Sequence, residues 1–202
     1  MRVLIDDAEW ENLEGELLEE ERKDLLERAR KEAARSRRFI RDILVDGKPL
    51  QEEAFLSMKG GLEVKFVTIS VKELVTESLE ETQRYMPALL DGINLVADRL
   101  EEKYDKDALT LLQQVTEGIG WVVKVLHNSL LLLGITDADL GDGGLGTTRE
   151  RLLQTLEGVL SPLEEGKFFE LAYRLREEVE PALSDLRRYI DELLAMASGE
   201  VQ

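Results

Sequence analysis

Hydrophobic residues in the first 70 positions follow two different spacings. "LEVKFVTIS" alternates with the two-residue period of a strand, and "RVLI" and "FIRDILVDGKPL" are further strand candidates. Residues 9–36 are rich in Glu, Leu, Ala and Arg, which favours a helix. The Asp46-Gly47 pair predicts a tight type I′ turn, in which both central residues take positive φ. We therefore predict a small α+β domain over residues 1–70, with a three-stranded sheet and one main helix.

From residue 71 onward, hydrophobic residues recur at helical spacing. This pattern predicts one helical hairpin over residues 71–134, with a kink or restart at Pro87, and a second over residues 149–197, with Pro181 inside its last helix. If the hairpins bury their apolar stripes against each other, they form one antiparallel bundle. The predicted fold class is α+β, mostly α. The hairpins also resemble each other in sequence, and an internal duplication stays open.

The segment between the hairpins, "GITDADLGDGGLGTTRE", invites a functional interpretation. Its glycines match the GxGxxG spacing of dinucleotide sites, but no strand precedes them. Its aspartates resemble a calcium loop, but two positions that should supply ligands are the glycines Gly141 and Gly143. We expect a mobile linker over residues 135–148 that binds neither metal nor nucleotide, with Thr147 or Thr148 capping the next helix.

The charge of the chain limits its partners. The net charge is -17, which disfavours nucleic acid and anionic membrane surfaces. Residues 1–70 hold 13 basic and 17 acidic residues, net -4, so the later helical part carries the remaining -13. The longest apolar stretch, residues 121–135, is too short to span a membrane, and no signal peptide is visible, so we expect a cytoplasmic protein without membrane insertion.

Residues for catalysis or cofactor binding are scarce. The chain has no cysteine, and His127 is its one histidine, which we expect to be partly buried or at the boundary of the apolar stripe. We therefore predict no catalytic site, no metal site and no cofactor. The basic stretch "RARKEAARSRRFIR" could hold an anion, but acidic residues earlier in the same segment favour a solvated helix with internal ion pairs.

"TEGIGWVV" is the most distinctive stretch within the helices. Glycine in a helix costs about 1 kcal/mol relative to alanine, so Gly118 and Gly120 indicate a close helix approach or a groove. We expect Trp121 to be buried beside them in a monomeric bundle. These three residues are the candidate partner-binding site, and replacing both glycines by alanine should leave the fold intact.

Several stretches resemble an uncharacterised bacterial protein family. They are "ILVDGKPL", "EVKFVTISVKELVTESLEE", "YMPALLDGINLVADRL", "EGIGWVVKVL" and "KFFELAYRLREEVEPAL". The resemblance implies a small α+β domain followed by paired helical hairpins. It implies no activity and transfers no functional residue. At the level of fold class alone, the acidic hairpins are also similar to flagellar export chaperones.

Two classes of function remain open. The first is a non-enzymatic interaction module, such as an adaptor, chaperone-like or assembly protein, which binds a basic or amphipathic-helical protein surface through its acidic bundle. The alternative is an enzyme or small-ligand-binding protein with a pocket between the α+β domain and the bundle. Carboxyl groups with raised pKa values in a polar pocket would favour the alternative.

Overall fold

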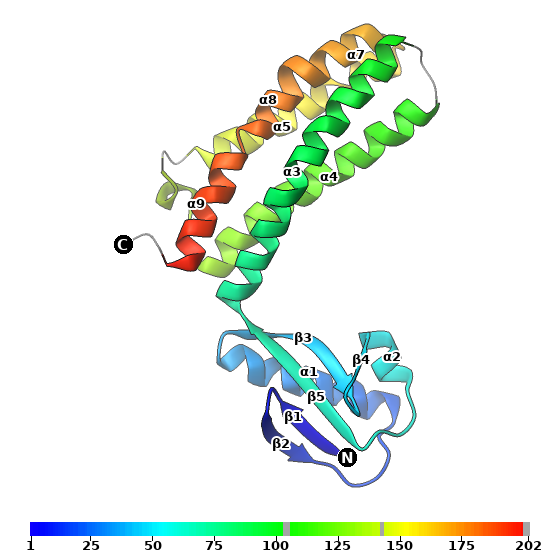
Figure 1. The fold of residues 1–202 in the computed structure, drawn as a ribbon, viewed down its shortest axis with the longest axis vertical. Coiled ribbons are helices and arrows are strands. Elements are labelled where there is room, and N and C mark those ends of the chain that lie inside the picture. The colour runs from blue at the N-terminus through cyan, green and yellow to red at the C-terminus, as the bar shows by residue number, and fades with distance from the viewer. Residues whose placement is uncertain (103–105, 142–143, 200–202) are drawn as a thin grey trace. The chain divides into compact units, whose positions relative to one another are not determined.

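The structure is a computed structural model that describes residues 1–102, 106–141 and 144–199. It is α+β and mostly helical (Figure 1). The chain divides into two compact units, Met1–Leu74 and Val75–Gln202. None of the helices in the described ranges is both long enough and apolar enough to cross a membrane.

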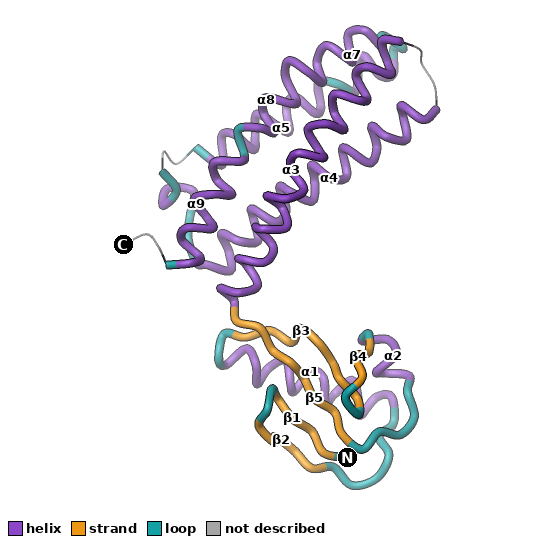
Figure 2. The backbone as a smooth tube through the Cα atoms, viewed as in Figure 1, coloured by secondary structure: helices purple, strands orange, loops and turns teal. Residues whose placement is uncertain are grey.

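The first unit is a five-stranded mixed sheet with two helices. The sheet order is β2-β1-β5-β3-β4. The β1–β5 pair is parallel, and the β1–β2, β3–β5 and β3–β4 pairs are antiparallel. Helix α1 lies on one face of the sheet (Figure 2). The elements are β1 Arg2–Ile5, β2 Ala8–Asn12, α1 Glu19–Arg35, β3 Arg38–Val45, β4 Lys48–Leu50, α2 Glu52–Ser57 and β5 Glu63–Ser70.

Alternation along β5 builds the core of this unit. Val64 and Phe66 are fully buried, and Phe66 packs edge-on against Phe55 of α2, with ring centroids 5.9 Å apart. The predicted turn is confirmed, because Asp46 and Gly47 have φ values of 48° and 77°. Leu62, which the alternation placed on the buried face, precedes the strand and is exposed.

The prediction of a three-stranded sheet is wrong, because the sheet has five strands, while α1 is the one main helix that was expected. Helix α1 begins at Glu19 rather than near residue 9, because Ala8–Asn12 forms strand β2 against β1. The composition of this segment suits a helix, but the pairing with β1 decides its conformation. The short strand β4 continues from the Asp46-Gly47 turn and was not expected as a separate strand.

The second unit is a bundle of two helical hairpins (Figure 1). Helix α4 packs on α9, and α5 packs on α8 and on the π-helix η2, Leu175–Val179. Helix α3 begins in the first unit and contributes most of its length to the bundle. The elements are α3 Val71–Glu102, α4 Lys106–Leu133, the 3₁₀ turn η1 Asp137–Asp139, α5 Leu145–Gly158, α6 Leu160–Glu164, α7 Phe168–Arg174, the π-helix η2 Leu175–Val179, α8 Glu180–Ser184 and α9 Arg187–Ser198.

Prolines affect the two hairpins differently. Helix α3 continues through Pro87 as one element, so the predicted restart is wrong. In the second hairpin the π-helix η2 immediately precedes Pro181, which occupies the first turn of α8. A proline clashes with the carbonyl four residues earlier, here that of Glu177, and a widened turn accommodates this clash. The second hairpin is therefore made of short segments instead of two long helices.

Candidate partner-binding groove

An open groove of about 410 Å³ lies between α3 and α4. Helix α3 contributes Glu81 and Tyr85, and helix α4 contributes Gln114, Glu117, Gly118 and Trp121. The spacing of these residues follows from helix geometry. Glu81 and Tyr85 are four residues apart, as are Glu117 and Trp121, so each pair lies on one helix face about one turn apart.

Gly118 makes room for the side chain of Tyr85 at the base of the groove. A Cβ atom at this position would lie in steric conflict with Tyr85 Oη and 2.8 Å from Leu89 Cδ1. The tyrosine side chain therefore occupies space that a larger residue at position 118 would need. These contacts are with side chains of α3, and α3 and α4 are not among the closely packed helix pairs of the second unit, so Gly118 fits the groove interpretation and not the close approach of two helices.

Gly120 behaves differently from Gly118. A Cβ atom added there would meet nothing within 4 Å, and Gly120 does not line the groove. Successive residues on a helix point about 100° apart, so a position two residues from Gly118 faces away from α3. The two glycines should not be treated as one site, because alanine at position 120 would enter open space, whereas alanine at position 118 would require Tyr85 and Leu89 to move.

Trp121 is not buried, which corrects the sequence-based expectation. Its side chain is 36% exposed, and Tyr85 beside it is 37% exposed. The two rings meet edge to face, with centroids 5.6 Å apart and planes at 84°. The buried stripe of α4 runs through Ile119 and Val122, and Trp121 lies beside this stripe. The hydrophobic pattern of a helix alone does not distinguish residues of the buried face from hydrophobic residues at the edge of that face.

Sequence reasoning missed Glu81, Tyr85, Gln114 and Glu117. Tyr85 lies four residues before Leu89, which is the spacing of one helix face, so its place in the sequence resembles that of a core residue. The antiparallel alignment of α3 and α4, which brings Tyr85 opposite Gly118, was the missing information. A glycine inside one helix and a large aromatic in its partner helix would have been the signal to search for.

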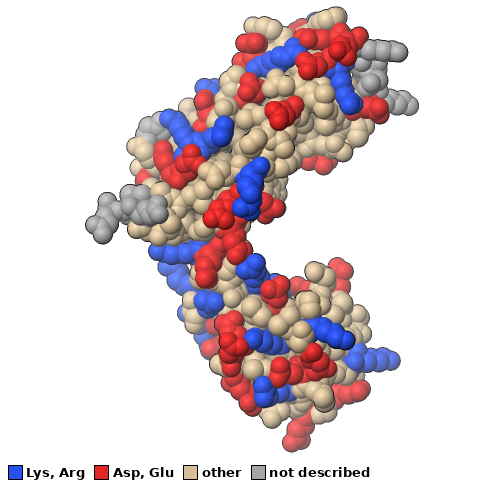
Figure 3. Space-filling model, viewed as in Figure 1, with Lys and Arg blue, Asp and Glu red and all other residues tan. Residues whose placement is uncertain are grey.

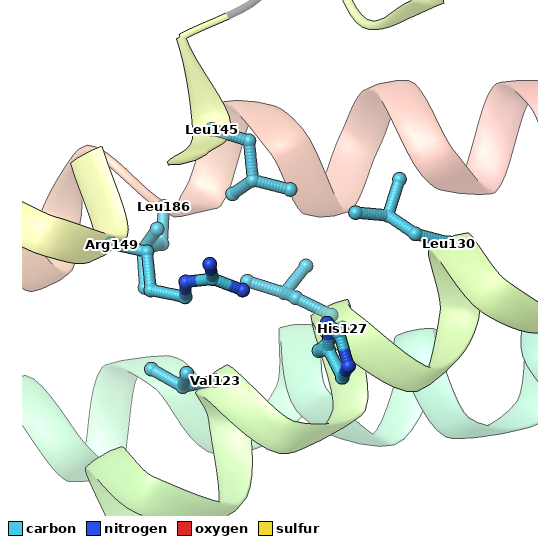
Figure 4. Close-up of a pocket in the computed structure, with 7 residues that line it drawn as sticks. Val123, His127, Leu130, Leu145, Arg149 and Leu186 are labelled. Carbon is cyan, nitrogen blue, oxygen red and sulfur yellow. The ribbon is translucent and has the colours of Figure 1, made fainter. Parts of the chain in front are cut away.

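His127 lies at a second, much smaller cavity of about 10 Å³, which is room for one water molecule. Helix α4 supplies His127 and helix α5 supplies Arg149, whose guanidinium extends toward the histidine (Figure 4). His127 is exposed beside the buried residues Leu126 and Leu130, which fits the boundary position and not the partly buried one. The rest of the lining is apolar: Val123, Leu126, Leu130, Leu145 and Leu186. With neither a carboxylate nor a hydroxyl in that lining, His127 has no partner there for acid–base or nucleophilic chemistry.

The segment predicted as a linker contains ordered structure in its described residues. Thr136 and Asp139 close the 3₁₀ turn η1, and Leu140 is fully buried. Helix α5 begins at Leu145, so neither Thr147 nor Thr148 caps it. Thr148 is instead buried inside the helix, 3.4 Å from Tyr189 Oη. Asp142 and Gly143, which belong to the GxGxxG and calcium interpretations, lie outside the described residues.

Most charged groups near the basic stretch are paired within the first unit. Arg28 bonds Asp24 and Glu11, and Arg30 bonds Glu27 and Glu52. The hydrogen bond that Arg28 Nε donates to Asp24 is the main influence that raises the pKa of Arg28. This pattern fits the expected solvated helix with internal ion pairs.

Carboxyl groups with perturbed pKa values in the described part of the chain all have lowered values. A hydrogen bond from Lys65 lowers the pKa of Asp7, and the hydroxyl of Ser70 lowers that of Glu73. The backbone N–H of Thr136 lowers the pKa of Asp139, and Lys167 lowers that of Glu165. Across these same ranges, no group of three or more His, Cys, Asp or Glu side chains could hold a metal ion.

Comparison with known proteins gives one match. The model of a family described as "Domain of unknown function (DUF8042)" matches residues 77–189, which is more than half of the chain and includes every residue of the groove. No curated protein and no solved structure matches the chain.

Proposed function

We propose that this chain, which belongs to the DUF8042 family, is a non-enzymatic interaction module that docks a partner protein in the groove between α3 and α4. In this role it serves as an adaptor, chaperone-like or assembly protein in the cytoplasm of a bacterial cell. The observation that carries the proposal is the exposed Tyr85–Trp121 pair, because tryptophan and tyrosine dominate the binding energy of protein interfaces.

The shape of the groove supports this proposal. Its walls are two helices of 32 and 28 residues, and its base lies at Gly118, where the Tyr85 side chain fills the space beside the glycine. A groove between two packed helices keeps its shape before a partner arrives, so little conformational entropy is lost on binding. Such grooves receive amphipathic helices in several recognition modes.

The alternative, an enzyme or small-ligand-binding protein, has less support. The lowered pKa values of Asp7, Glu73, Asp139 and Glu165 arise from ordinary surface hydrogen bonds. A raised carboxyl pKa in a polar pocket would have favoured it.

Affinity capture with three versions of the full chain tests the proposal. Wild type, Trp121→Ala and Tyr173→Ala are used as bait in extract of the cells that make the protein. Tyr173 is the matched control, since it is 61% exposed on the other hairpin and does not line the groove. We expect wild type and Tyr173→Ala to capture the same set of proteins. Trp121→Ala should lose this set although the circular dichroism spectrum of the variant matches that of wild type. Capture that is the same with all three baits contradicts the proposal.

A further inference from the structure

We infer that the α3–α4 groove receives the cationic head of a lysine or arginine side chain that the partner protein presents on an amphipathic helix. This inference rests on the proposed docking function and specifies the chemistry of the partner. Three features support it: the aromatic pair, the carboxylates beside it, and a comparable tryptophan elsewhere in the chain.

The aromatic pair provides the surface that a cation prefers. Tyr85 and Trp121 meet at 84°, so their rings form a corner, and both rings are more than one-third exposed. The face of an aromatic ring carries partial negative charge, and tryptophan attracts cations most strongly of the three aromatic residues. A cation placed in this corner would contact both rings.

Two carboxylates of the groove add to this attraction. Glu81 lies one turn before Tyr85 on α3, and Glu117 lies one turn before Trp121 on α4. Among the described residues, neither forms an ion pair with a lysine or arginine. Glu117 Oε1 accepts a hydrogen bond from Gln113 Nε2 at 2.9 Å, which is a neutral donor. Neither of the two carboxylates of the groove is therefore balanced by an ion pair within the described chain.

The first unit shows what the same group of residues binds when the chain supplies the cation. The guanidinium of Arg28 lies over the ring of Trp10, 5.6 Å from the centroid, and is bonded to Glu11. Tryptophan, glutamate and arginine thus form one contact group in that unit. In the groove, Trp121 and Glu117 have the same chemistry, but no lysine or arginine is among the lining residues.

The net charge of the helical part of the chain favours a partner of opposite charge. Residues 71–202 carry a net charge of -13, from 13 basic and 26 acidic residues. The visible face of the helical unit shows acidic and basic groups with uncharged surface between them (Figure 3). An amphipathic helix with a lysine or arginine beside its apolar face matches both the rings and the carboxylates. An acidic segment would be repelled.

Titration with matched peptides tests this inference. Three synthetic peptides share one Leu/Ala amphipathic helix and differ at one position, which is lysine, norleucine or glutamate. Binding to the full chain is followed by the NMR signals of the two indole N–H groups, and Trp10 serves as the internal reference. We expect saturable shifts at Trp121 alone, with the lysine peptide binding about tenfold more tightly than the norleucine peptide.

Variants separate the charge from the shape of the groove. The double substitution Glu81→Gln and Glu117→Gln should weaken the lysine peptide about tenfold and leave the norleucine peptide unchanged. The control is Glu150→Gln with Glu157→Gln, which removes the same charge from two exposed positions of α5 and should change neither affinity.

Three results would overturn the inference. They are equal affinity for the lysine and norleucine peptides, no saturable shift at Trp121 up to about 1 mM lysine peptide, and a dimer by sedimentation that Trp121→Ala converts to monomer. The last would show that a second copy covers the rings. If protein capture depends on Trp121 but the lysine peptide does not bind more tightly than the norleucine peptide, docking in the groove is supported and recognition of a cation is wrong. If capture does not depend on Trp121, the proposed function fails whatever the peptides show.

Discussion

The two tryptophans of this chain have similar neighbours but different exposure. Trp10 in the first unit is half-buried and covered by Arg28, which also bonds Glu11. Trp121 in the second unit stands beside Tyr85 and Glu117, and it is 36% exposed. A tryptophan with a carboxylate beside it forms a complete structural contact where the fold supplies a cation, as Arg28 does at Trp10. Trp121 has no such cation among the groove residues, and we propose that a partner supplies it.

The largest expected effect concerns the base of the groove. Gly118→Val should lower the free energy of unfolding of the second unit by about 1–3 kcal/mol, because the added side chain meets Tyr85 and Leu89. It should also displace Tyr85 and so separate the aromatic pair. Chemical denaturation followed by circular dichroism measures the change.

Gly120→Val is the matched control for this substitution. Position 120 is open, so valine should leave stability within about 0.5 kcal/mol of wild type. Equal destabilisation by the two substitutions would show that contact of the side chain at position 118 with Tyr85 and Leu89 does not determine the effect.

A smaller effect is expected when the cation over Trp10 is removed. Arg28→Gln removes both the contact with the ring and the ion pairs to Asp24 and Glu11, and should destabilise the first unit by about 1 kcal/mol. Trp10 emission, recorded with Trp121→Phe in the background, should shift to longer wavelength as the ring gains water. Arg35→Gln is the control, because Arg35 pairs only with Glu32 at an exposed position. A similar spectral shift with both substitutions would contradict this account of Trp10.

Ionic quenchers compare the electrostatic surroundings of the two rings directly. With the other tryptophan replaced by phenylalanine, caesium should quench Trp121 more efficiently than iodide does. The quenching constant for caesium divided by that for iodide should be about twofold higher for Trp121 than for Trp10. Glu81→Gln with Glu117→Gln should reduce this ratio. A ratio that these substitutions leave unchanged would mean that the two carboxylates do not set the potential at the ring.

The smallest expected effect is a pH dependence at the turn η1. The backbone N–H of Thr136 lowers the folded-state pKa of Asp139 below 3.8. The stabilising contribution is therefore fully present above pH 3.8 and is lost as the pH falls through the folded-state pKa. Asp139→Asn should lower the Tm slightly near neutral pH, and the difference from wild type should close in acid. If the difference in Tm between wild type and Asp139→Asn stays constant as the pH falls below the folded-state pKa, the ionised carboxylate of Asp139 is not its source.

Much of the architecture could be predicted because local patterns and tertiary packing agree there. The alternation in β5, the Asp46-Gly47 turn and the stripe of α4 each satisfy local preferences and the core at once. Strand β2 was missed because its sequence favours a helix, and only pairing with β1 reverses that preference. The short helices of the second hairpin were missed because hydrophobic periodicity continues across the breaks.

The groove was predicted only in part, for a geometric reason. Gly118 and Trp121 were recognised from their residue types within one helix. The identity of the opposite wall depends on the alignment of α3 against α4, which no single-helix pattern contains. Burial of Trp121 was expected because large aromatic residues usually lie in the core, and its place beside the buried stripe overrides that tendency.

Site-specific photo-crosslinking tests the central claim, that the α3–α4 groove is the docking surface, most directly. A benzophenone amino acid is introduced at Gln114, an exposed residue of the groove, or at Glu157, an exposed residue of α5. The cells that make the protein are then irradiated. Our account predicts a defined crosslinked product from position 114, none from position 157, and loss of the product when Trp121→Ala is added. Equal crosslinking from both positions, or a product from position 114 that survives Trp121→Ala, would contradict it.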